Sequence, residues 1–359
     1  MEPEQAAGQV LWIGFHGRDP DARLLALARD GALGGIVLFR RNLGAPEHVA
    51  ALVDAHVRAC PDEAPPLVAV DQEGGRVARL GPPVLRLPAA RVMGRLNSAL
   101  VERAAATLGR QLRALGFSAD FAPVLDVDTR PDSPVIGDRA FGETPDAVIE
   151  AAGAFARGLR HAGILYCGKH FPGHGDAALD SHLALPVVLH DLARLEAVEI
   201  APFAALCGDL PMVMTAHVLY EALDPERPAT LSRPILQGLL RERLGFRGLV
   251  VSDDLEMRAV ADRWSVAQAA VLAVEAGCDA LLVCSDVGVA LQARDALASR
   301  AASDPWFASR LRDAARRGLE LRARHRPKPV TDPIALAAAL DVPERAELEA
   351  ELVRAHHGA

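Results

Sequence analysis

The sequence lacks any run of about 18 apolar residues, so it offers no candidate for a membrane-spanning helix. It also lacks an excess of basic residues, because 39 Lys and Arg stand against 47 Asp and Glu and give a net charge of -8. This balance argues against nucleic acid or an anionic membrane as a partner. The acidic first residues show no basic stretch followed by an apolar one, so we expect no signal peptide.

Cysteines are few, odd in number and without CxxC spacing. Most of the five stand within apolar stretches, which is typical of reduced, buried thiols rather than of a disulfide framework. No internal repeat or low-complexity tract is present, and half of the 359 residues are apolar, enough for a large core. We therefore predict a globular, monomeric protein of the cytoplasm.

Short apolar segments, apolar on both faces, alternate with amphipathic segments along most of the chain, which is typical of parallel strands covered by helices. The predicted strands are residues 9–15, 34–40, 66–72, 118–127, 164–171, 212–218, 248–254 and 280–284. The predicted helices are residues 46–60, 100–115, 146–161, 191–206, 233–244, 266–276 and 290–299.

Eight strand–helix units over about 300 residues favour an α/β fold in which a (β/α)8 TIM-type barrel closes on itself. An open, doubly wound sheet is the alternative, although no GxGxxG motif follows the first strand. We assign residues 1–300 to the catalytic barrel. Residues 301–359 are predicted to form a C-terminal helical extension packed on it, with an exposed connector at 324–333 and one or two helices at 334–357.

The densest polar cluster is KHFPGHGDAALDSH, Lys169 to His182, which directly follows a predicted strand. Proline and glycines in its first half prevent helix formation. In an extended segment, residues two apart point the same way, so Asp180 and His182 can lie side by side. A carboxylate beside an imidazole fixes its tautomer and raises its pKa, which suits proton transfer near neutrality.

Other predicted strands also end in polar residues, and in a barrel these ends meet on one rim. A rim rich in carboxylates and guanidinium groups suits a ligand with many hydroxyls. These residues are Asp71, Glu73, Arg76, Arg79, Asp126, Asp128, Arg139, Thr215, His217, Ser252, Asp253 and Asp254.

Several rim residues can also be interpreted as having purely structural roles. Asp126 and Asp128 can cap loops, Arg76 can pair with a nearby carboxylate, and His217 can be a hydrogen-bonded core histidine. A metal site would need two imidazoles one helical turn apart, which Pro172, Gly173 and Gly175 prevent. We therefore predict no metal and no cofactor, with a metal-dependent barrel hydrolase kept as the alternative of another class.

Together these segments resemble glycoside hydrolase family 3, in its bacterial β-N-acetylglucosaminidase (β-hexosaminidase) branch. The resemblance covers about residues 9–290. It is carried, in order, by GGIVLFRRN (34–42), VDQEGGRV (70–77), VIGDRAF (135–141), KHFPGHG with DSH (169–182) and VSDDLEM (251–257). Alanines at 177 and 178 depart from the threonine or valine frequent in relatives.

The resemblance implies Asp253 as the nucleophile and His182 as the general acid/base, with Asp180 holding it. It also implies that the N-acetylglucosamine ring is bound by Asp71, Arg79, Arg139, Lys169 and His170. From the residues alone Asp253 and Asp254 remain alternatives. Strand alternation predicts that only one of them faces the barrel mouth. The same rule predicts a bend or bulge that lets adjacent Lys169 and His170 both reach the sugar.

The implied activity is that of a retaining exo-β-N-acetylglucosaminidase that removes terminal N-acetylglucosamine from muropeptides in cell-wall recycling. Its partner is a small saccharide substrate. An imidazole acid/base does not repel anions as a carboxylate does, so a β-N-acetylglucosaminide phosphorylase built from the same residues is an alternative.

Overall fold

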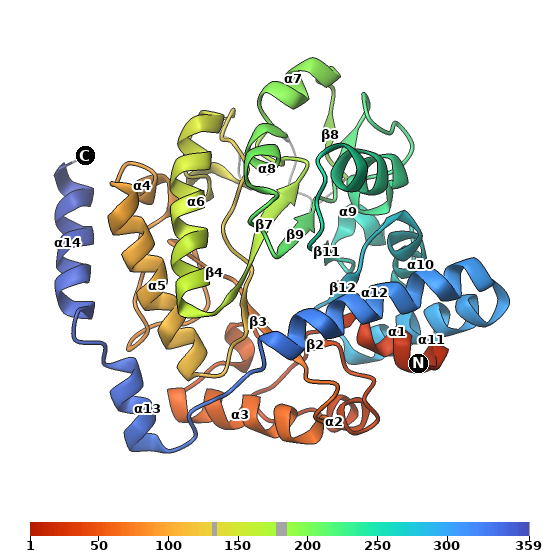
Figure 1. The fold of residues 1–359 in the computed structure, drawn as a ribbon, viewed down its shortest axis with the longest axis horizontal. Coiled ribbons are helices and arrows are strands. Elements are labelled where there is room, and N and C mark those ends of the chain that lie inside the picture. Colours follow the sequence, from red (N-terminus) through yellow and green to blue (C-terminus); the bar gives the residue numbers. More distant parts are fainter. Residues whose placement is uncertain (131–134, 177–184, 359) are drawn as a thin grey trace.

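The computed structural model describes residues 1–130, 135–176 and 185–358. Within them, eight parallel strands close into a barrel in the order β1-β12-β11-β9-β7-β6-β3-β2 (Figure 1). β1 pairs with both β12 and β2, so the barrel prediction is confirmed and the open-sheet alternative is wrong. The strands are β1 (Leu11–Ile13), β2 (Gly35–Val37), β3 (Leu67–Val70), β6 (Ala119–Asp120), β7 (Leu165–Phe171), β9 (Met212–Thr215), β11 (Leu249–Asp254) and β12 (Ala280–Val283).

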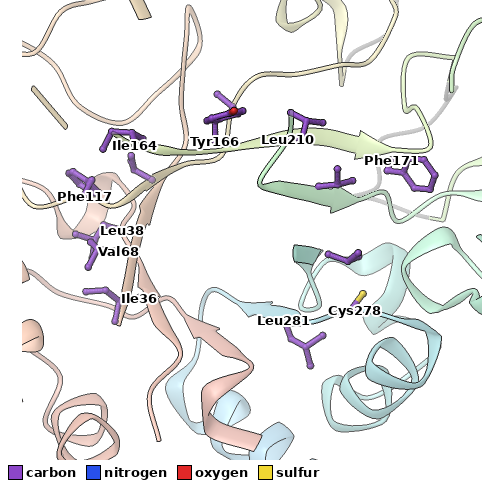
Figure 2. Packing of buried hydrophobic residues seen from close by; sticks show 14 of the residues in the cluster. Ile36, Leu38, Val68, Phe117, Ile164, Tyr166, Phe171, Leu210, Cys278 and Leu281 are labelled. Atoms are coloured by element: carbon purple, nitrogen blue, oxygen red, sulfur yellow. The ribbon is translucent and has the colours of Figure 1, made fainter. Parts of the chain in front are cut away.

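The core has two layers, because successive strand residues point to opposite faces. On β3, Leu67 and Ala69 fill the barrel interior with Trp12 and Phe121 of neighbouring segments. Val68, between them, belongs to the outer layer, which packs against the helices. Figure 2 shows part of this outer layer, including Ile36, Val68, Ile164 and Leu281.

Helices surround the barrel much as predicted, with one break. The predicted helix 191–206 is interrupted at residues 198–200. Pro202 has no N–H to continue the first helix and lies in the first turn of a second one, which begins at Ala201. The residues predicted as helix 233–244 form a π-helical segment, η4 (Pro234–Arg243). The α-helices up to the eighth barrel strand are α1 (Pro3–Gln9), α2 (Ala22–Arg29), α3 (Pro46–Ala59), α4 (Ala90–Met93), α5 (Ser98–Ala114), α6 (Pro145–Ala162), α7 (Leu192–Ala197), α8 (Ala201–Leu206), α9 (Arg258–Ala261) and α10 (Val266–Ala276).

After β12 the chain forms α11 (Val287–Ser303), α12 (Pro305–Arg324), α13 (Pro333–Leu340) and α14 (Arg345–Gly358). α12 runs beside α1 in Figure 1 and buries Phe307 and Leu311. Buried Arg322, near its end, donates to the backbone oxygens of Pro65, at 3.0 Å, and Gln9, at 3.4 Å. Because those residues precede β3 and β1, α12 covers the N-terminal end of the barrel.

The last two helices lie on the outside of the barrel, as the sequence predicts for residues 334–357. α13 packs against α5 and α3, and Glu351 of α14 forms an ion pair with Arg103 of α5 at 3.1 Å. Throughout the described ranges, none of the helices has both the length and the apolar character needed to cross a bilayer.

Candidate active site

A cavity of about 240 Å³ opens where the barrel strands end. Its polar lining consists of Asp71, Glu73, Arg76, Arg79, Arg139, Lys169, His170, His174, Asp253 and Asp254. Six of the eight site residues implied by the resemblance are therefore brought together. The other two, Asp180 and His182, lie outside the described residues.

The loop after β3 is a tight hairpin made by β4 (Gln72–Gly74) and β5 (Val77–Ala78). The Gln72 side chain closes it by accepting from the backbone N–H groups of Arg79 and Leu80 at 2.8 and 3.0 Å. Gly74 has a φ of +108°, and a Cβ there would lie 2.5 Å from the Pro88 carbonyl oxygen. Only glycine fits this turn without strain, so the hairpin of the DQEGG segment has a definite shape that fixes Glu73 over the cavity.

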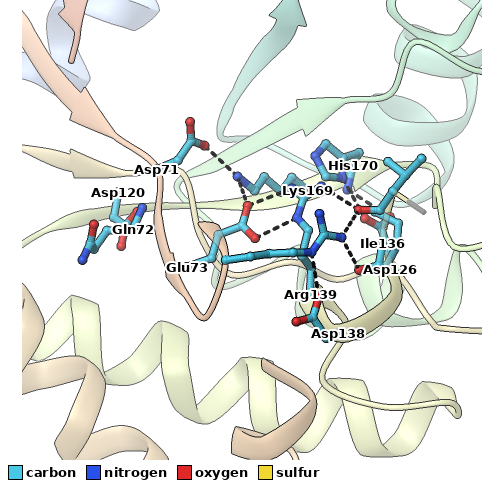
Figure 3. Close-up of polar contacts among 12 residues, drawn as sticks. Asp71, Gln72, Glu73, Asp120, Asp126, Ile136, Asp138, Arg139, Lys169 and His170 are labelled. Carbon is cyan, nitrogen blue, oxygen red and sulfur yellow. Dashed lines mark hydrogen bonds and ion pairs between the residues drawn. The ribbon is translucent and has the colours of Figure 1, made fainter. Parts of the chain in front are cut away.

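Glu73 joins two cations in the cavity wall (Figure 3). Its Oε1 lies 2.6 Å from Lys169 Nζ and accepts from Arg139 Nη2 at 2.8 Å, while Oε2 accepts from Arg139 Nε at 2.9 Å. Burial raises the pKa of Glu73, but the charges of Arg139 and Lys169 outweigh it and hold the pKa well below its ordinary value. The sequence placed Glu73 on the rim without assigning it a role, because nothing in the pattern showed that both cations converge on it.

Asp71 occupies the neighbouring position on the same wall. Its Oδ1 accepts from Lys169 Nζ at 2.9 Å, and its Oδ2 lies 3.3 Å from Arg79 Nη2. Burial again raises the pKa, but Lys169 and Arg79 outweigh it, so the pKa of Asp71 is lowered. Lys169 is 2% exposed, and its two carboxylate partners raise its pKa although burial alone would lower it. The cluster therefore stays charged at neutral pH.

Lys169 and His170 both line the cavity although they are adjacent in β7. The register between β7 and β9 shifts between Gly168 and Phe171, which confirms the predicted irregularity. Whether both then contact a sugar stays a prediction.

The Asp126 carboxylate contacts both the ring and the backbone of His170. Its Oδ2 lies 2.7 Å from His170 Nδ1, and its Oδ1 accepts from the backbone N–H groups of His170 and His174 at 3.1 and 2.7 Å. Asp126 is fully buried, so its structural reading is confirmed, but the residue it supports faces the cavity. Burial and the neighbouring His170 lower the pKa of His174 to about 4, which keeps that imidazole neutral.

Asp253 and Asp254 end β11, and both line the cavity. The prediction that only one of them faces the barrel mouth is therefore wrong. The reason is local: the pairing of β11 with β12 shifts between Val251 and Asp254, so strict alternation ends before the last two residues. Asp253 Oδ1 accepts from the Asp254 N–H at 2.8 Å. Burial raises its pKa, but His217, His170, the Asp254 N–H and Lys169 together outweigh this and lower it.

Three further rim residues make structural contacts. Arg76 forms an ion pair with Asp138 at 2.7 Å and donates to the Val135 carbonyl oxygen, so it ties down the loop before Arg139. Asp128 is buried in an ion pair with Arg91. His217 is buried and lies 2.7 Å from Thr230 Oγ1 and 2.9 Å from the Asp254 carbonyl oxygen.

The same cluster bears on the question of metal binding. Among the residues that the structure describes, no group of three or more His, Cys, Asp or Glu side chains is arranged to hold a metal ion. The carboxylates of Asp71 and Glu73 are instead neutralised by Lys169, Arg79 and Arg139.

Comparison with known proteins points to one family. The family model for the glycosyl hydrolase family 3 N-terminal domain matches residues 4–320. A protein named beta-hexosaminidase from Methylococcus capsulatus is 46% identical over 277 residues, which cover 76% of this chain and 81% of the relative. One of the same name from Pseudomonas aeruginosa is 41% identical over 288 residues, covering 80% and 85%.

Comparison with solved structures points to the same family. A family 3 β-N-acetylglucosaminidase from Paenibacillus is 37% identical with a TM-score of 0.92, covering 99% of this chain and 69% of that one. NagZ from Neisseria gonorrhoeae, solved with N-trifluoroacetyl-D-glucosamine, is 30% identical with a TM-score of 0.78, covering 96% and 97%. The chain belongs to glycoside hydrolase family 3, in its bacterial β-N-acetylglucosaminidase branch.

Proposed function

We propose that this glycoside hydrolase removes single terminal N-acetylglucosamine residues from peptidoglycan-derived muropeptides, with retention of anomeric configuration. The observation that carries the proposal is the placement of charge around one cavity. In the order of the barrel, β11 and β3 are separated by four steps in either direction, so Asp253 stands opposite Asp71. A sugar bound by the cluster at β3 and β7 therefore presents its far edge to Asp253.

Asp253 is the proposed nucleophile. In the described part of the chain its Oδ2 accepts no hydrogen bond, and its lowered pKa keeps it ionised. Attack on the anomeric carbon forms a glycosyl-enzyme as His182 gives its proton to the leaving oxygen. His182 then takes a proton from water, which attacks the same carbon and releases Asp253. Asp180 would hold the imidazole; the roles of these two residues rest on the sequence match.

The remaining cluster would bind the ring. Asp71 can accept from sugar hydroxyls, while Arg79, Arg139, Lys169 and His170 supply donors. A cavity of about 240 Å³ favours a single ring over a polysaccharide segment, which supports exo rather than endo cleavage.

An aryl β-N-acetylglucosaminide tests the assignment. We expect the wild type to release the phenol and Asp253→Ala to lose at least a thousandfold in kcat, because the covalent step has no substitute. Asp262→Ala, an exposed aspartate on the nearby α9 end, serves as the matched control and should keep full activity. Full activity in Asp253→Ala would reject the proposed nucleophile.

The natural substrate, the cellular compartment and the oligomeric state each need a separate measurement. A muropeptide carrying terminal N-acetylglucosamine should be cleaved faster than the intact polymer, and proton NMR of the first product should show the β anomer. Cell fractionation and light scattering test the proposed cytoplasmic monomer.

Phosphorolysis is the second candidate, favoured by one observation. Lys169, Arg79 and Arg139 place three cations around the cavity, and the proposed acid/base is an imidazole, so phosphate meets less repulsion than at a carboxylate pair. At millimolar phosphate, N-acetylglucosamine 1-phosphate as the main product would establish this reaction, while free N-acetylglucosamine alone would exclude it.

A further inference from the structure

Asp254 is a second cavity carboxyl that the proposed chemistry does not use. Its Oδ1 is fixed by two backbone N–H groups, those of Glu256 at 3.1 Å and Cys284 at 3.2 Å. Within the described ranges, its Oδ2 makes no hydrogen bond or ion pair, and it is not a sealed buried atom. One oxygen therefore orients the group while the other remains available to a ligand in the cavity.

The surroundings of Asp254 differ from those of the other cavity carboxyls. Asp71 and Glu73 each contact two cations, whereas Asp254 has no ion pair in the part of the chain that the structure describes. Among the described residues, the titratable groups whose charges act on it include Asp253 and Glu256 from its own strand end and the Cys284 thiol beyond β12. The Arg41 guanidinium donates to the Cys284 carbonyl oxygen and forms no ion pair with Asp254. His217 reaches only its backbone oxygen, at 2.9 Å.

These surroundings favour the neutral acid. Burial is the main cause that raises the pKa of Asp254 to about 7; the charges of Glu256 and Asp253 add to it, and the two N–H groups oppose it. Ionising both Asp253 and Asp254 in one cavity is unfavourable because their negative charges repel. The proton therefore stays on Asp254, which lacks an ion-paired cation among the described residues. A neutral Oδ2 is a hydroxyl donor, which none of the other described cavity carboxyls provides, because their pKa values are lowered.

We propose that Asp254 contacts the bound saccharide directly and donates a hydrogen bond from Oδ2 to a sugar oxygen. The inference rests on the proposed function, because it requires the sugar to lie against Asp253. Ionisation of Asp254 removes the donor and puts a second negative charge beside Asp253. Saccharide affinity should therefore fall as the pH rises through neutrality.

The test is N-acetylglucosamine binding measured by calorimetry at pH 6 and pH 8.5, since this ligand neither titrates nor reacts. Wild type should lose about three- to tenfold in affinity, the worth of one hydrogen bond. Asp254→Asn keeps an oxygen for the two N–H groups and places an NH2 donor where Oδ2 was, so it should match wild type at pH 6 and stay constant to pH 8.5. Asp253→Asn removes the neighbouring charge, lowers the pKa of Asp254 and should move the affinity loss to lower pH.

Two results would overturn the inference: weaker binding by Asp254→Asn already at pH 6, or the same pH dependence as wild type. Different results would refute the proposed function. Absence of N-acetylglucosamine binding by wild type, or full activity of Asp253→Ala, would remove it, whereas failure at Asp254 leaves Asp253 and its chemistry untouched.

Discussion

Replacing Glu73 by glutamine separates the structural role of the charged cluster from its contacts with substrate. The substitution keeps the shape of the side chain and removes its charge. Lys169 still has Asp71 at 2.9 Å, but Arg139 loses its only carboxylate among the described residues and keeps the Val135 carbonyl oxygen at 3.2 Å. Breaking a buried ion pair costs about 3–5 kcal/mol. Because the amide oxygen can keep one contact, we expect about 3 kcal/mol of lost unfolding free energy at pH 7.

The pH dependence of this loss has a definite sign. The pKa of Glu73 is lower in the folded protein than in the unfolded chain, so its contribution to stability is fully present above the unfolded pKa of about 4.3. It is lost as the pH falls toward the folded pKa. The difference between wild type and Glu73→Gln should thus be constant from about pH 6 to 8 and shrink by about 1.4 kcal/mol per unit below pH 4.

Urea unfolding followed by circular dichroism measures the difference, provided the slopes of the two proteins agree. Glu63→Gln is the matched control: Glu63 is exposed and should change stability by less than about 0.5 kcal/mol. A loss under 1 kcal/mol at pH 7, or an undiminished difference at pH 3, would contradict the reasoning that Glu73 is a buried anion stabilised by two cations.

Three other predictions follow from the contacts around the cavity and at the barrel base. Asp126→Asn should lower kcat/KM about tenfold in steady-state assays with the thermal midpoint little changed, because it weakens the contact with His170 Nδ1 but keeps an acceptor for the backbone. Deleting residues from 304 onward should abolish the folded protein on gel filtration, since Phe307 and Arg322 are buried. Deleting from 342 onward removes buried Leu348 and Leu352 but no residue of the cavity, so it should lower the thermal midpoint and leave activity intact. Dialysis against a chelator should leave activity unchanged, because lysine and arginine already neutralise Asp71 and Glu73 in the cavity. Lost activity restored by a metal would favour the metal-dependent alternative.

The barrel could be predicted because its signals are local. Apolar segments of strand length recur eight times, and parallel strand ends share one rim, so Asp71, Lys169 and His170 were expected together before any contact was known. The charge network could not be predicted. Glu73 meets Arg139 across 66 residues of sequence and Asp71 meets Lys169 across 98, and no local pattern encodes such pairs. The proposed sugar-binding residues come from the resemblance alone.

Helix α12 makes a buried polar contact that its composition could not reveal. The segment after residue 300 is rich in arginine and was predicted to pack on the barrel as an extension. One of those arginines, Arg322, is 1% exposed and satisfies backbone oxygens ahead of two barrel strands. Charged residues in a helix indicate a solvent-exposed face only when no backbone oxygen beneath the helix needs a hydrogen-bond donor. The open N-terminal end of a parallel barrel, with its unpaired carbonyl groups, does need them.

The choice between Asp253 and Asp254 now has a physical basis that the sequence lacked. Both carboxyls line the cavity, so orientation does not separate them. Electrostatics does, because His217, His170 and Lys169 lower the pKa of Asp253, whereas burial and neighbouring anions raise that of Asp254 to about 7. A nucleophile must be ionised at working pH, and a pKa of about 7 leaves a large share of Asp254 protonated near neutrality. The asymmetry of cations across the barrel therefore supports Asp253 as the nucleophile independently of the family match, and it leaves Asp254 as the carboxyl that can donate.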